Sequence, residues 1–152
     1  MKIAVLGAGA WGSALASALS VCAHQVTLWG REAKVMAELR ATRINTQFLP
    51  EIELNTALRY SDHLHDTLDA HRAPDDVLII ATPISGLRET AQKITAHPTQ
   101  AAVLWLCKGV ERTTLQFPHQ VVGSILHPQT PFGVLSGPSF AQEVARGLPC
   151  AL

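Results

Sequence analysis

The stretch that decides the fold is Lys2-Ile3-Ala4-Val5-Leu6-Gly7-Ala8-Gly9-Ala10-Trp11-Gly12. Residues 2–6 form a short apolar run, which predicts a buried strand. The alanine-rich residues 10–23 predict a closely packed helix after the glycines. The chain is therefore expected to begin with a strand, a tight turn and a helix.

The glycines of this turn follow the pattern Gly-x-Gly-x-x-Gly. Gly7 permits a tight turn, Gly9 lets the backbone approach a pyrophosphate, and Gly12 lets the helix pack closely on the strand. Free N–H groups and the positive end of the helix dipole would hold the phosphates. Glycines that serve turn and packing alone are the alternative, but the position between a strand and a helix favours a dinucleotide site.

The rest of the chain repeats the alternation of strands and helices. Expected strands are residues 25–29, 58–61, 77–81, 101–106 and 132–135. Expected helices are residues 32–40, 62–70, 85–95, 119–126 and 139–146. Residues 43–54 are expected to be irregular. This order predicts an α/β fold, a Rossmann-type doubly wound, mostly parallel sheet with helices on both faces.

Composition excludes several classes of protein. The 152 residues fit a single domain, and 12 basic residues balance 12 acidic ones, which argues against a general grip on nucleic acid or an anionic membrane. Charged residues make up only 16% of the chain and hydrophobic ones 47%, so we expect a globular domain with some surface covered by another part. Cys22, Cys107 and Cys150 lack the spacing of a metal or redox site and are expected to be small core residues in a reducing cytoplasm.

Both ends of the chain contain uncharged stretches that have more than one interpretation. Residues 3–30 contain no Asp, Glu, Lys or Arg, and Ala16-Ser17-Ala18 resembles a cleavage site, so a secretory signal is an alternative. The glycines and the polar pair His24-Gln25 inside this stretch argue against it. Residues 148–152 look like the opening of a buried strand, which suggests a piece of a longer chain.

Residue 31 bears on the choice of cofactor. A site specific for NAD places Asp or Glu on the adenine ribose at the end of the second strand, where this chain has Trp29-Gly30-Arg31. Arg31 can pair with a 2′-phosphate, so NADP is favoured over NAD, although Glu32 stands beside it. A solvated arginine at the start of a helix is the alternative.

Unusual residues follow several strands at the edge where a ligand crevice is expected: Thr82-Pro83, Lys108-Gly109 and Gly137-Pro138-Ser139. Lys108 leaves a buried strand and is placed to meet a phosphate or polarise a carbonyl, unless it merely extends into solvent. Ser139 is expected to be a helix N-cap whose neighbouring N–H groups could bind ligand oxygens. His63, His65 and His71 are expected on the surface as solvated imidazoles, with no metal site.

Four motifs together resemble bacterial NAD(P)-dependent glycerol-3-phosphate dehydrogenases. They are Gly7–Gly12, Asn45-x-x-Phe48-Leu49-Pro50, Lys108-Gly109-x-Glu111 and Gly137-Pro138-Ser139-Phe140-Ala141-x-Glu143-Val144-Ala145. Phe48 stands where that family usually has tyrosine. The resemblance makes residues 1–152 the NAD(P)-binding domain and places a helical domain, with a lysine as general base, beyond Leu152. No catalytic residue is therefore expected in this chain.

The resemblance also implies contacts at individual positions. Cofactor contacts would be Gly7, Gly9, Ala10, Trp11, Gly12, Arg31, Lys108 and Ala141, and substrate contacts would be Lys108, Gly137 and Ser139. The implied activity interconverts dihydroxyacetone phosphate and sn-glycerol 3-phosphate with NADP or NAD, for phospholipid synthesis in the cytoplasm. Nucleic-acid binding and membrane insertion are not expected, and a homodimer of the whole protein is compatible with the resemblance. The alternatives are a 3-hydroxyacid or ketopantoate dehydrogenase and a non-catalytic nucleotide-sensing module.

Overall fold

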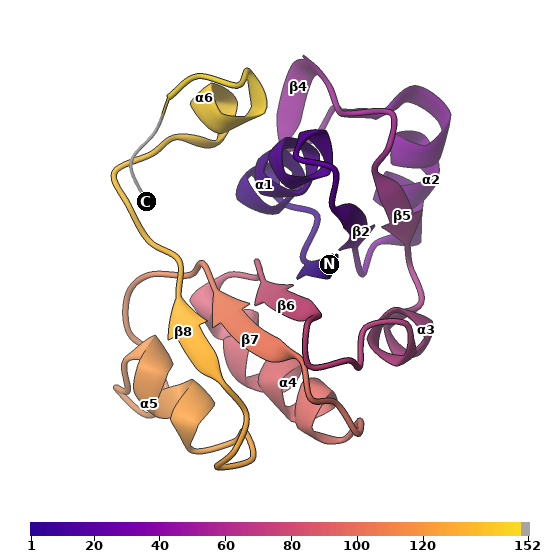
Figure 1. Cartoon of the computed structure of the whole chain (residues 1–152). Coiled ribbons are helices and arrows are strands. Elements are labelled where there is room, and N and C mark those ends of the chain that lie inside the picture. Colours follow the sequence, from indigo (N-terminus) through magenta and orange to yellow (C-terminus); the bar gives the residue numbers. More distant parts are fainter. Residues whose placement is uncertain (150–152) are drawn as a thin grey trace.

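A computed structural model describes residues 1–149 and contains the expected α/β fold (Figure 1). Six parallel strands form one sheet in the order β5-β2-β1-β6-β7-β8. The strands are β1 (Lys2–Leu6), β2 (Gln25–Trp29), β5 (Arg59–Ser61), β6 (Val77–Ile80), β7 (Ala102–Trp105) and β8 (Phe132–Val134). The chain winds outward from β1 in one direction and then, from β6, in the other. The predicted Rossmann-type sheet is confirmed, and its switch point lies between β1 and β6.

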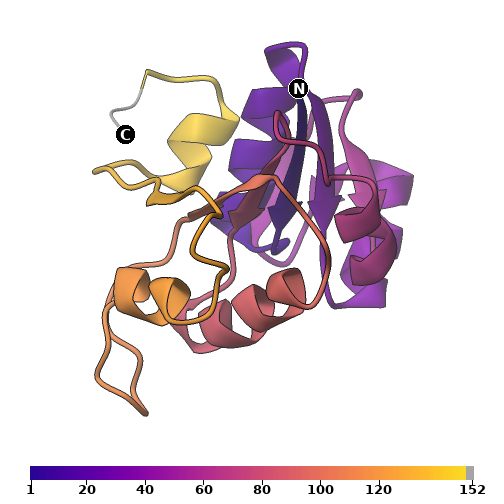
Figure 2. The same ribbon diagram turned by 60° about the horizontal axis from the view of Figure 1, so that its bottom comes forward.

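Helices cover both faces of this sheet. They are α1 (Ala10–Val21), α2 (Ala33–Thr42), α3 (Leu64–Asp69), α4 (Ile84–Thr95), α5 (Pro118–Gly123) and α6 (Ala141–Ala145). Side chains alternate along β1, so Ile3 and Val5 join the core beneath α1 and α2. Ala4 and Leu6 join the opposite core beneath α4 and α5, which lie side by side in Figure 2.

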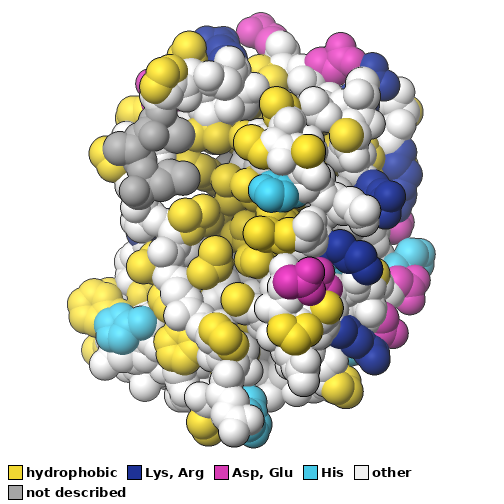
Figure 3. Space-filling view, viewed as in Figure 1, with side chains coloured by type: hydrophobic (Ala, Val, Ile, Leu, Met, Phe, Trp, Pro, Cys, Tyr) yellow, Lys and Arg dark blue, Asp and Glu magenta, His cyan; other side chains and the backbone are white. Residues whose placement is uncertain are grey.

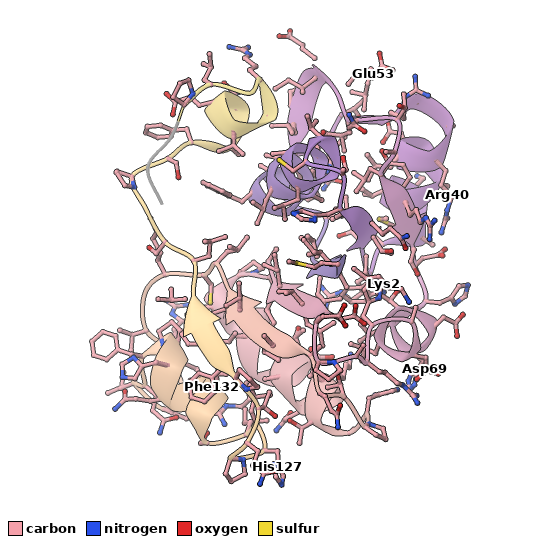
Figure 4. The ribbon with its side chains drawn as sticks, viewed as in Figure 1. Lys2, Arg40, Glu53, Asp69, His127 and Phe132 are labelled. Atoms are coloured by element: carbon pink, nitrogen blue, oxygen red, sulfur yellow. The ribbon has the colours of Figure 1, made fainter. Side chains whose placement is uncertain are left out.

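The prediction that residues 43–54 are irregular is wrong. A small antiparallel hairpin forms there from β3 (Ile44–Asn45) and β4 (Leu49–Glu53). It adds Leu49 and Ile52 to the core beneath α1 and α2. Its outer side carries the ion pair of Arg43 with Glu53, and the labelled Glu53 and Arg40 lie at the periphery in Figure 4. The hairpin thus extends the layer that contains α1.

Three further predictions are wrong in detail. His71 is not solvated but 3% exposed, and its Nδ1 lies 2.7 Å from the Thr67 carbonyl oxygen. Cys22 is exposed at the end of α1 and is not a core residue. Ser139 is not an N-cap, because α6 begins at Ala141 with Phe140 in the cap position. The side chain of Glu143 accepts the Phe140 N–H at 3.3 Å and so caps this helix from within.

The expectations for the end of the chain are tested only in part. Leu148 is exposed and lies in no strand, so the predicted strand does not begin there. Pro149 is likewise exposed and lies in no strand, whereas residues 150–152, which include Cys150, lie outside the described residues. Within residues 1–149, no helix is long and apolar enough to cross a membrane.

One face of the molecule leaves hydrophobic side chains uncovered. Figure 3 shows them gathered in a recess between the region of α1 and α6 and the region of β7 and β8. On β8, Phe132 is 46% and Val134 58% exposed. The edge strand is therefore covered less completely than the central strands, which agrees with the expectation that part of this surface packs against something else.

Candidate functional site

A pocket of about 890 Å³ lies at the carboxyl ends of the strands. The segments that follow β1, β2, β6, β7 and β8 all contribute to its wall. They are residues 7–11, 30–32, 81–86, 106–108 and 135–137. Because β1 and β6 are neighbours and their connections leave in opposite directions, a crevice opens between them. The pocket is where this fold class binds its ligands.

The glycine turn after β1 has the geometry that its sequence predicts. Gly7 has φ +136°, and a Cβ there would meet the Ala81 backbone carbonyl carbon of the neighbouring segment at 2.8 Å. A Cβ on Gly12 would meet the Gly7 carbonyl oxygen at 1.9 Å, so α1 sits against the turn only because Gly12 has no side chain. These two glycines are required by the fold itself.

Gly9 differs from its two neighbours in the motif. A Cβ built there has no heavy atom within 4 Å, and its φ of −76° is open to any residue. Gly9 is the N-cap of α1 and lines the pocket. Neither backbone strain nor crowding within the protein requires glycine here, so the open space in front of Gly9 is a cradle that fits a phosphate group at the helix N-terminus.

Charged side chains surround the part of the pocket next to β2. Arg31 and Glu32 follow that strand, and α4 contributes Glu89 and Lys93. The Lys93 ammonium lies 2.6 Å from the Glu89 carboxylate, and this bond, together with the positive charge of Arg31, lowers the pKa of Glu89. Arg31 is exposed and has no ion pair among the described residues, which leaves its guanidinium free to meet an anion.

Lys108 and Gly137 are brought together in the pocket wall. The Lys108 ammonium donates to the Gly137 carbonyl oxygen at 2.9 Å, which joins the segments after β7 and β8. Three residues beyond Lys108, Glu111 is 8% exposed and accepts from Arg88 of α4 at 2.9 and 2.8 Å. The bonds from Arg88 and Thr114 lower the pKa of Glu111. This partly buried ion pair fastens the loop that carries Lys108 to the body of the domain.

The structure does not place every predicted site residue in the pocket wall. Gly7, Gly9, Ala10, Trp11, Arg31, Lys108 and Gly137 line it, whereas Gly12, Ser139 and Ala141 do not. Gly12 lies beneath the turn, and Ser139 has a buried hydroxyl with no hydrogen-bond partner among the described residues. Burial raises the pKa of the Cys107 thiol at the pocket wall, so the thiol stays protonated near neutral pH. No group of side chains in the described part of the chain could hold a metal ion.

Two pocket residues on α4 had escaped the sequence analysis. Glu89 and Lys93 look like an ordinary surface pair on a helix, and only the sheet order brings α4 beside the segment after β2. Trp29 and Thr82 present a buried indole N–H and a buried hydroxyl without partners among residues 1–149. The sequence analysis had placed Thr82 at the expected crevice, and it had named Trp29 only for its place at the end of the second strand.

Comparisons with known proteins point to one family. A family model described as the NAD-dependent glycerol-3-phosphate dehydrogenase N-terminus matches residues 2–152. A protein of Ralstonia nicotianae named glycerol-3-phosphate dehydrogenase (NAD(P)+) is 44% identical over all of this chain and 46% of its own length. One of the same name from Paucimonas lemoignei is 49% identical over all of this chain and 45% of its own. The chain thus spans less than half of these relatives.

A solved structure from the same family is similar to this chain. The crystal structure of glycerol-3-phosphate dehydrogenase from Coxiella burnetii superposes with a TM-score of 0.86 at 32% sequence identity. The match covers 97% of this chain and 44% of that one. The similarity therefore extends through the whole sheet and its helices.

Proposed function

The chain belongs to the NAD-dependent glycerol-3-phosphate dehydrogenase family, and we propose that it is the NAD(P)-binding domain of an enzyme that interconverts dihydroxyacetone phosphate and sn-glycerol 3-phosphate. The observation that carries the proposal is a single pocket in which the open turn at Gly9 and the Lys108–Gly137 pair face the same space. A dinucleotide needs the first feature and a phosphorylated carbonyl compound needs the second.

The end of the pocket at the glycine turn binds the dinucleotide, and the end at Lys108 binds the substrate. The N–H groups at the start of α1 hold the pyrophosphate, and Trp11 and Ala10 form the adjoining wall. A nicotinamide held in this pocket would supply hydride transfer to and from the carbonyl carbon of the substrate. Lys108 offers its positive charge to the substrate phosphate or to the carbonyl oxygen as negative charge develops there. Gly137 lines the pocket at the substrate end, whereas Ser139 and Ala141 lie outside the pocket wall and are assigned ligand contacts only by the family resemblance.

The proton of the new hydroxyl needs a further group. We propose that it comes from a lysine in a helical domain of the whole protein, as the family resemblance implies. The curated relatives are more than twice as long as this chain, which leaves room for such a domain in them. We also propose that the enzyme works in the cytoplasm and supplies glycerol phosphate for phospholipids.

The test is the oxidation of NADPH or NADH by the whole protein with dihydroxyacetone phosphate. We expect turnover with this substrate and none with ketopantoate or with 3-oxoacids. Turnover with one of those compounds alone would support a different dehydrogenase. A whole protein that binds the dinucleotide and reduces none of these substrates would support a nucleotide-sensing module.

Arg31 gives a prediction about the choice between the two dinucleotides. We expect the protein to bind NADPH at least as well as NADH, and Arg31→Ala to weaken NADPH about tenfold or more while NADH changes little. A charge-assisted hydrogen bond to the 2′-phosphate is worth about 1.5–3 kcal/mol, and NADH lacks that phosphate. Kd values from fluorescence titration measure both effects. Arg72→Ala, at an exposed arginine outside the pocket wall, is the control, and equal weakening of both dinucleotides by Arg31→Ala would contradict the role of Arg31.

A further inference from the structure

We propose that Asn45 is a positioning residue that aims the Gly9 N–H at the cofactor. The inference rests on the proposed function, because it concerns the same pocket and the same ligand. Asn45 does not itself line the pocket. It acts through the peptide that joins Ala8 to Gly9.

Asn45 is fully buried, with 0% exposure, in the short strand β3. Its side-chain amide donates to the Ala8 carbonyl oxygen at 2.9 Å and to Ser13 Oγ at 2.8 Å. Because a carbonyl oxygen can only accept, the group that faces Ala8 is the NH2 and not the oxygen of the amide. A residue 37 positions along the chain therefore holds the middle of the glycine turn.

The bond to Ala8 determines where Gly9 points. The Ala8 carbonyl and the Gly9 N–H belong to one planar trans peptide, so they point in opposite directions. When Asn45 holds the carbonyl on the core side, the N–H is turned away from the core, to the side where Gly9 meets open space. This N–H belongs to the N-terminal end of α1, where no helical carbonyl can accept it. It is thus kept ready for a ligand oxygen.

The oxygen end of the Asn45 side chain bonds to the β3–β4 hairpin, which also contributes to the pocket wall. The Asn45 side-chain oxygen Oδ1 accepts the Phe48 N–H at 3.3 Å, and the Asn45 backbone carbonyl oxygen accepts the same N–H at 3.3 Å. Phe48 is 41% exposed and lines the same pocket as the glycine turn. One buried amide therefore sets the spacing between the β3–β4 hairpin and the turn that faces it.

Substitutions of Asn45 should affect ligand binding if it is a positioning residue, and stability alone if its role is purely structural. Ser13 is also 0% exposed and shares the same buried network, but its hydroxyl does not touch Ala8. Ser13→Ala is therefore the matched control, because it removes one bond of Asn45 and leaves the peptide before Gly9 in place. Asn45→Ala removes all three hydrogen bonds of the side chain, to Ala8, Ser13 and Phe48. Asn45→Asp keeps the size of the side chain but places a carboxylate oxygen against the Ala8 carbonyl oxygen.

The experiment measures Kd for NADPH and for ADP, together with the free energy of unfolding, in the whole wild-type protein and these variants. We expect Asn45→Ala and Asn45→Asp to weaken both ligands about tenfold or more, because both contain the pyrophosphate. Ser13→Ala is expected to lower stability and to leave both Kd values within about twofold. A folded Asn45 variant that binds like wild type, or a Ser13 variant that binds as poorly as the Asn45 variants, would overturn the positioning role.

A measurement on the unaltered protein keeps the inference testable if both Asn45 variants fail to fold. In the amide NMR spectrum, the Gly9 N–H resonance should move when ADP is added, while the Asn45 side-chain NH2 resonances should stay in place. A Gly9 resonance that does not move in a protein saturated with ADP would refute the inference and leave the proposed function standing. A wild-type protein that binds neither NADPH nor NADH would instead refute the proposed function.

Discussion

A protein that carries Gly9→Val is expected to fold like the wild type and to lose NADPH binding by about a hundredfold or more. The backbone at Gly9 has φ −76° and ψ −177°, which a β-branched residue adopts without strain. No protein atom lies within 4 Å of the new Cβ, so the added methyl groups enter the pocket and not the core. They take the space in which a pyrophosphate would approach the start of α1.

Graded and matched variants separate the loss of binding from a loss of fold. Gly9→Ala should weaken NADPH less than Gly9→Val, since it adds only one carbon atom. Gly133→Ala in β8 is the control, because a Cβ there makes an ordinary contact of 3.4 Å with Leu104 outside the pocket. Titration with NADPH and urea unfolding measure the two properties. A folded Gly9→Val protein that binds NADPH as tightly as wild type would show that the pyrophosphate lies elsewhere.

The Rossmann-type sheet could be predicted because each pattern that specifies it lies within a short stretch of the sequence. The runs at β1, β6 and β7 are continuous and apolar, as expected of parallel strands covered on both faces. Each is followed by a segment with helical composition, so the order of elements alone restricts the topology to very few folds. The glycine turn could be predicted for the same reason, since strand, turn and helix are adjacent in the sequence.

The β3–β4 hairpin could not be predicted by the same reasoning. Pro50 lies inside β4, where proline removes a backbone donor, and Glu51 has φ +66°. Along β4 only Leu49 and Ile52 are buried, a spacing that does not match the alternation of a regular strand. The hairpin is held by its contacts with α1, α2 and α6 and not by a local preference for strand.

Long-range hydrogen bonds explain why parts of the site were missed. The bond from Asn45 to Ala8 spans 37 positions, and that from Arg88 to Glu111 spans 23. Nothing in the neighbourhood of Asn45 along the chain indicates a buried amide. The chain at His71 is also joined to a distant segment, because the His71 backbone carbonyl oxygen accepts the Thr99 hydroxyl from 28 positions away.

Lys108→Ala is expected to lower turnover with dihydroxyacetone phosphate about a hundredfold or more and to change the Kd for NADPH only slightly. The Lys108 ammonium sits in the pocket wall, held at 2.9 Å from the Gly137 carbonyl oxygen. Removing a single donor that stabilises developing negative charge typically costs about 10²–10³ in kcat. The loop itself should keep its shape, because Glu111 fastens it to Arg88 independently of Lys108.

The measurement is NADPH oxidation by the whole protein, with cofactor binding determined separately by fluorescence titration. Lys34→Ala is the matched control, since Lys34 is an exposed lysine of α2 outside the pocket wall. Lys108→Arg keeps the positive charge on a longer and planar group, so we expect it to recover only part of the lost turnover. If Lys108→Ala turned over at the wild-type rate, its charge would not act on the substrate and the bond to Gly137 would be structural only. If instead cofactor binding fell as much as turnover, Lys108 would serve the cofactor and not the reacting carbonyl, because a loss confined to the transition state leaves the ground-state complex intact.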